Sequence, residues 1–164
     1  MRIVFASMMF VGLLLAVNSP AAEPGTREVL QEIGAALAWR LGPETIEDAC
    51  RPLDPENSDA RKKALDAWRV KNGALIREVD SRVEEVMPVL NPKAPAADSV
   101  KAVRSNVKAL LLEKHFGELH ADQKVQFCKE VSNPADKRWN DNGMPHVQQA
   151  LAVLYDWKMQ QGAK

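Results

Sequence analysis

The sequence predicts an all-α fold, a small antiparallel bundle of about four main helices and two short ones held by one disulfide. Apolar residues recur at steps of three and four along most of the chain. No stretch longer than about four residues alternates apolar and polar residues as a half-buried strand does. Prolines and glycines interrupt the helical pattern at a few points and divide it into pieces of helix length.

The first 21 residues have the pattern of a signal peptide. Arg2 precedes the apolar run Ile3–Val17, and small residues suited to a signal peptidase follow at 19–22. The run is shorter than the roughly 20 apolar residues that span a bilayer. We therefore expect cleavage after Ala21 and a single all-α domain over residues 22–164. The expected location is periplasmic or secreted, assuming bacterial export, with no stable membrane insertion after cleavage.

Charge and cysteine content narrow the possible partners and the compartment. The 164 residues include 22 basic and 22 acidic side chains, so loss of Arg2 leaves a net charge of −1. Nucleic-acid-binding domains usually carry a basic excess, and we expect no nucleic-acid partner. Cys50 and Cys128 are the only cysteines, and an oxidising compartment favours a bond between them. The closed loop of about 78 residues would contribute up to about 4.5 kcal/mol.

A long segment from Asp54 to Met87 is predicted to be the central helix. Asp54 before Pro55 suits an N-cap, Ser58 is a second possible start, and Pro88 is expected to end the helix. Asn72-Gly73 is also a turn signal, but the stripe keeps its phase across it, which favours one continuous helix. The inward stripe is Ala64, Leu65, Trp68, Asn72, Leu75, Ile76, Val79, Val83 and Val86. The opposite face is predicted to carry Arg61, Lys62, Lys63, Arg69, Lys71, Arg77, Glu78, Glu84 and Glu85.

The other helices are predicted from the same periodicity. A first helix should run from Thr26 to Leu41 and stop at Gly42-Pro43, with a separate helical turn over Glu44–Cys50. The remaining expected helices are a long one from Asp98 or Ser99 to Gly117, a short one over Ala121–Val131, and a last one over Pro145–Gln160.

Two sets of residues are candidates for contact with a protein partner. Lys101, Arg104 and Lys108 recur at i, i+3 and i+7 and form a basic row on the predicted outer face of their helix. Such a row is either a solvated surface or a docking strip for an acidic protein or an anionic envelope surface. Arg138 and Trp139 lie in a polar loop, and both residue types are enriched at binding hot spots. Alternatively, Trp139 folds back over the core.

Trp68 and Asn72 are a candidate pocket within the bundle. They lie four apart on the inward stripe, so they share one face of the helix. A buried Asn needs hydrogen-bond partners, and we expect a backbone group of the Cys50 segment or of the loop near Trp139. The functional alternative is a small pocket with an apolar wall and one polar handle.

Catalytic, metal and cofactor signatures are lacking in the sequence. His115 and His120 lie five apart with Gly117 between them, which does not match the helical zinc motifs. There is no Cys-x-x-Cys-His and no Gly-x-Ser-x-Gly. We therefore predict no catalytic, metal or cofactor site, and an enzyme is not favoured.

The expected function is an exported helical module that binds an envelope protein, as an inhibitor, immunity-type protein or adaptor does. The alternative is a carrier or sensor of a small apolar ligand bound near Trp68 and Asn72.

Overall fold

The computed structural model describes residues 24–132 and 144–162. This part of the chain forms five α-helices and one turn of 3-10 helix, without strands. The elements are α1 (Pro24–Cys50), η1 (Pro55–Asn57), α2 (Ser58–Leu90), α3 (Ala96–Phe116), α4 (Ala121–Val131) and α5 (Met144–Gly162). The predicted all-α bundle is confirmed.

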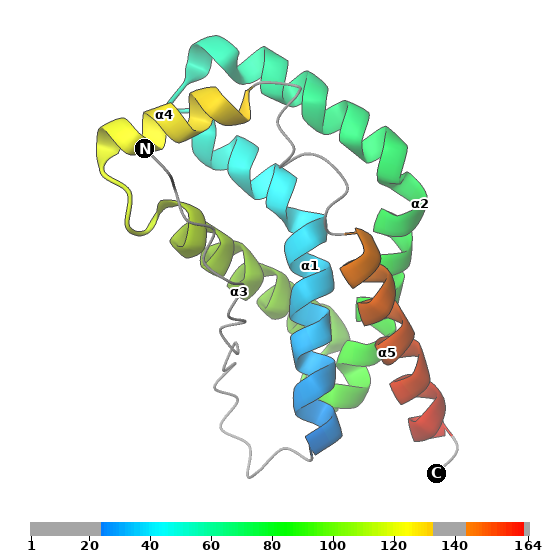
Figure 1. Cartoon of the computed structure of the whole chain (residues 1–164). Coiled ribbons are helices and arrows are strands. Elements are labelled where there is room, and N and C mark those ends of the chain that lie inside the picture. The colour runs from blue at the N-terminus through cyan, green and yellow to red at the C-terminus, as the bar shows by residue number, and fades with distance from the viewer. Residues whose placement is uncertain (1–23, 133–143, 163–164) are drawn as a thin grey trace.

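The four long helices form the main core. Figure 1 shows α1 between α3 and α5, while α2 begins near α4 and turns toward the α5 side along its length. Each long helix contributes one apolar stripe, because only one face can turn toward its neighbours. The fully enclosed members of this core are Ile33, Ala36, Leu37, Val79, Val83, Val86, Ala150 and Leu154. α4 contributes no residue to it.

The predicted break at Gly42-Pro43 is wrong, because α1 continues through Pro43 to Cys50. The expected separate turn over Glu44–Cys50 is therefore the last part of α1. Pro43 lacks the amide that would bond the carbonyl of Trp39, a loss of roughly 3 kcal/mol in a helix interior. Burial continues on both sides of it, since Leu41 and Thr45 are both enclosed and the Thr45 hydroxyl donates to the Leu41 carbonyl at 2.8 Å.

The ends of α2 also differ from the prediction. The helix begins at Ser58, the second of the two starts considered, and Asp54 makes no capping hydrogen bond. Pro88 lies inside the helix, which ends at Leu90 and not at Met87. The amide of Asn91 closes the last turn on the Met87 carbonyl at 2.9 Å. Continuity through Asn72-Gly73 is confirmed.

The later helices agree more closely with expectation. α4 has the predicted bounds, α3 ends before Gly117 as predicted, and α5 is one or two residues longer at each end. α3 starts at Ala96, before the expected caps at Asp98 and Ser99. Ser99 has a different role, because its hydroxyl accepts a hydrogen bond from the Asn91 side chain at 3.1 Å across the α2–α3 turn.

The predicted Cys50–Cys128 disulfide is confirmed, with an S–S distance of 2.04 Å. It joins the last residue of α1 to α4. Two small apolar clusters surround this corner of the molecule. One contains Leu65, Trp68 and Val131, and the other contains Phe116 and the two cysteines.

Candidate functional site

An open groove of about 700 Å³ lies between α1, α2 and the first half of α3. All three members of the predicted basic row, Lys101, Arg104 and Lys108, line it. Its apolar surface comes from Leu41, Ala96, Ala97 and Val100. Four cationic side chains line the groove against two carboxylates, those of Glu44 and Glu84. The groove therefore combines an apolar surface with a positive charge balance.

Arg104 is held by acidic residues of α2. Its Nη2 lies 3.0 Å from the Asp80 carboxylate and 3.5 Å from that of Glu84. The second oxygen of Asp80 accepts from Arg40 of α1 at 3.2 Å. These contacts fix the guanidinium between three helices and neutralise its charge. The Nε of Arg104 is buried without a hydrogen-bond partner among the described residues.

Lys101 and Lys108 differ from Arg104. Neither ammonium group has an ion-pair partner within the described residues, and Lys101 is exposed. They lie seven residues apart on α3, or roughly 10 Å along the helix axis. Two members of the predicted basic row, Lys101 and Lys108, are therefore available to bind a partner. Arg104 instead forms ion pairs that link helices of the bundle.

Glu44 connects the groove to a second ion pair. It accepts from Arg40 at 3.0 Å and from Arg69 at 2.9 Å. Burial alone would raise the pKa of Glu44, but hydrogen bonds and charge from Arg69 and Arg40 outweigh it and hold the pKa below its ordinary value. The carboxylate thus stays ionised and holds the wall of the groove together.

Trp68 and Asn72 are both buried, as predicted. The Trp68 ring packs against Trp39, with ring centroids 5.1 Å apart, and its cluster includes Leu65 and Val131. The amide of Asn72 donates to the Trp68 carbonyl of its own helix at 3.0 Å, and not to the Cys50 segment. The loop near Trp139, the other expected partner, lies outside the described residues. Side chains of the same cluster pack beside Trp68. A small ligand near Trp68 and Asn72 stays a prediction.

Arg138 and Trp139 lie outside the described residues. Their proposed part in partner binding stays a prediction.

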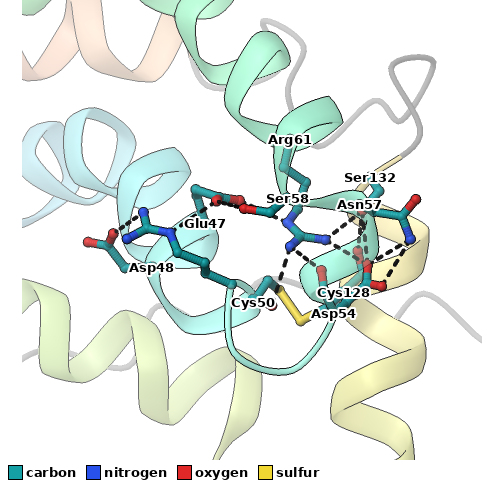
Figure 2. Close-up of polar contacts among 10 residues, drawn as sticks. Glu47, Asp48, Cys50, Asp54, Asn57, Ser58, Arg61, Cys128 and Ser132 are labelled. Atoms are coloured by element: carbon teal, nitrogen blue, oxygen red, sulfur yellow. Dashed lines mark hydrogen bonds and ion pairs between the residues drawn. A yellow bond between two sulfur atoms is a disulfide. The ribbon is translucent and has the colours of Figure 1, made fainter.

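Arg61 is the most unusual residue of the described structure, and its predicted place on the exposed face is wrong. Its side chain is fully enclosed. The guanidinium donates to Glu47 at 2.8 Å and to the Asp54 carboxylate at 2.6 Å (Figure 2). It also reaches the Ser132 hydroxyl at 2.8 Å and the backbone carbonyls of Asp54 and Cys50. This cluster joins α1, the η1 turn, α2 and the end of α4.

Charge balance explains how the cluster tolerates burial. Two enclosed carboxylates face one enclosed guanidinium, and Arg51 supplies a second positive group 3.5 Å from Glu47. Asn57 donates to both oxygens of Asp54, and the Ser58 hydroxyl donates to Glu47. A buried carboxylate is tolerated only when such partners replace water.

Helical phase is the signal that identifies Arg61. It lies four residues before Leu65 and therefore shares the inward stripe that continues through Trp68. Residue type alone favours the surface for an arginine. The exception arises because Glu47, at the end of α1, and Asp54, in the connection that follows it, both turn toward Arg61 and supply its counter-ions.

The histidines do not form a metal site in the described structure. The His115 ring lies 5.9 Å from the Phe127 ring, and His120 precedes α4, where its amide donates to Gln123. Within residues 24–132 and 144–162, no three His, Cys, Asp or Glu side chains group as metal ligands. None of the helices in this region is both long and apolar enough to cross a membrane.

Comparisons of the chain with protein-family models, with curated proteins and with solved structures give no match.

Proposed function

We propose that this protein is an exported helical module that binds an acidic segment of a partner protein, as an inhibitor, immunity-type protein or adaptor in the cell envelope. The observation that carries the proposal is the pair Lys101 and Lys108. Both ammonium groups border a groove with apolar surface, and neither is paired within the described part of the chain. Such a surface complements carboxylates that flank an apolar side chain.

The groove is also preorganised for this role. Arg40 and Arg104 are already held by Asp80, so their side chains need little further ordering when a partner arrives. Opposite charges additionally speed the encounter, and this effect weakens with salt. The disulfide is compatible with an oxidising compartment, and the leader-like first 21 residues support a periplasmic or secreted location.

Affinity capture from the native envelope tests the proposal. The bait is the mature protein, and the test variant is Lys101→Glu/Lys108→Glu. The matched control is Lys62→Glu/Lys63→Glu, which makes the same charge change at two exposed positions near the start of α2. We expect the wild type and the control to retain one specific partner, and the groove variant to bind it at least tenfold more weakly. The isolated variants should have unchanged circular dichroism.

If both variants retain the partner equally, the groove is not the binding site. If the wild type recovers no specific partner, the proposed binding function is wrong. A Trp139→Ala bait tests the predicted contribution of the loop in the same experiment. Fractionation of the expressing cells tests export, since a chain that stays in the cytoplasm contradicts the proposed location.

A further inference from the structure

The buried Arg61 cluster reaches the backbone at both ends of the disulfide. Nη2 of Arg61 lies 3.3 Å from the Cys50 carbonyl oxygen and donates to it. Nη1 donates to the Ser132 hydroxyl at 2.8 Å, and that hydroxyl donates to the Cys128 carbonyl, also at 2.8 Å (Figure 2). None of these hydrogen bonds uses a sulfur atom. The same contacts are therefore available when Cys50 and Cys128 are thiols.

Within the described residues, α4 is attached to the rest of the structure at this corner. It contributes nothing to the main core, and its buried side chains are those of Cys128 and Val131. Phe127 packs edge-on against Phe116, with centroids 5.1 Å apart, and Val131 joins the Trp68 cluster. The bridge from Arg61 to Ser132 adds a polar attachment immediately after the helix ends.

We infer that Arg61 and Ser132 are positioning residues for the Cys50–Cys128 bond. In the dithiol protein they keep α4 docked, so that the Cys128 thiol faces the Cys50 thiol before oxidation. The bond then forms by thiol–disulfide exchange with a disulfide oxidant such as oxidised glutathione. The two protein thiols lose two protons and two electrons, and the oxidant becomes two molecules of reduced glutathione. A docked α4 favours this intramolecular bond over bonds between chains.

A thermodynamic cycle links docking to oxidation. An interaction that favours the docked position of α4 in the reduced protein raises the effective concentration of the two thiols. The rise equals the factor by which that interaction increases the docked population. Two cysteines 78 residues apart on a flexible chain would meet only at the low effective concentration of a long loop. The contacts of Arg61 and Ser132 instead hold Cys128 close to Cys50 before the bond forms.

The test compares two serine-to-alanine variants of the same cluster. Ser132→Ala removes the link to α4 and leaves Arg61 with Glu47, Asp54 and the Cys50 carbonyl. Ser58→Ala removes a hydrogen bond to Glu47 at 3.2 Å, and among the described residues the Ser58 hydroxyl makes no hydrogen bond to either cysteine or to α4. Each mature protein is equilibrated in mixtures of reduced and oxidised glutathione, alkylated, and weighed by mass spectrometry.

We expect Ser132→Ala to lower the effective concentration of the thiols about tenfold, which corresponds to about 30 mV for a two-electron couple. Ser58→Ala should change it less than twofold. Equal changes in the two variants, or no change in Ser132→Ala, would overturn the inference, because a general loss of stability would then account for any effect.

Hydrogen exchange supplies a second readout. In a Cys50→Ala/Cys128→Ala protein, amides of α4 should stay protected because the Arg61–Ser132 bridge is intact. Adding Ser132→Ala should reduce that protection about tenfold while the amides of α5 keep theirs. If α4 exchanges at the rate of an unstructured chain in the double variant with Ser132 present, the bridge does not hold the helix and the inference fails.

Discussion

The main core and the corner around Arg61 hold the same chain together by different means. In the main core, residues such as Ile33, Leu37 and Leu154 are enclosed by other apolar side chains from four long helices. At the corner, an enclosed ion cluster and a disulfide join α4 to α1 and α2. The two regions lie next to each other, and Trp39 contacts clusters of both.

The difference follows from helix length. A long helix presents four or more turns of apolar surface, and its burial at roughly 25 cal/mol per Å² is sufficient for docking. α4 has only 11 residues and buries few large side chains. A short helix of this kind needs directed bonds to stay in place. A single substitution in the core should therefore lower the free energy of unfolding only slightly. Removal of a single partner at the corner should lower it by several times as much.

The largest expected effect comes from Arg61→Met. The substitution leaves Asp54 enclosed without its counter-ion and Glu47 with only the exposed Arg51, and loss of one member of a buried ion pair costs about 3–5 kcal/mol. The measurement is urea unfolding of the oxidised protein. The triple variant Arg61→Met/Glu47→Gln/Asp54→Asn should recover more than half of the loss, since no buried charge remains. A change below about 1 kcal/mol in the single variant would contradict the buried cluster.

A smaller effect is expected from Ile33→Val in the main core. The side chain is fully enclosed on α1, and removal of one methylene from such a site costs about 0.5–1.5 kcal/mol. The same urea experiment measures it. Val70→Ala on the exposed face of α2 is the control and should stay within about 0.5 kcal/mol of the wild type. A loss in Ile33→Val as large as that in Arg61→Met would remove the contrast between the two regions.

The smallest expected effect is the pH dependence contributed by Glu44. Its pKa in the folded protein is below the ordinary value of 4.5. The stabilisation is therefore present in full above about pH 4.5 and is lost as the pH falls through the lower, folded-state pKa. Because Arg69 is 45% exposed, solvent screens the pair, and Glu44→Gln should cost only a few tenths of a kcal/mol at neutral pH.

Unfolding curves of Glu44→Gln and the wild type at several pH values check this. The difference between them should shrink below pH 4.5 and in high salt. Glu118→Gln, in the turn after α3, is the control. If the difference between the two proteins grows on acidification, the pKa of Glu44 is raised and not lowered in the folded protein.

Parts of the fold could be predicted because local pattern and local energy agree there. The bounds of α4, the end of α3 at Gly117 and the inward stripe of α2 follow from periodicity and terminating residues. The prolines at 43 and 88 were misleading, because the loss of one backbone hydrogen bond is smaller than the gain from burying the residues on either side. Helix ends next to a proline are therefore decided by packing.

The candidate site, too, could be predicted only in part from the sequence. The spacing of Lys101, Arg104 and Lys108 on one helix was readable from the chain, but the acidic partners of Arg104 come from α2 and the groove needs α1 as its second wall. No rule of local spacing brings Asp80 beside Arg104.

By itself, the sequence determined the helical class, the apolar stripes and the pairing of two cysteines, since each depends on periodicity or on counting. Only the tertiary structure decided that Arg61 is enclosed, that Asp54 is its partner and not a helix cap, and that two lysines of the basic row have no ion-pair partner in the part of the chain that the structure describes. The physical reason is that the free energy of a charge depends on what surrounds it in space. Those surroundings come from segments that the fold brings together.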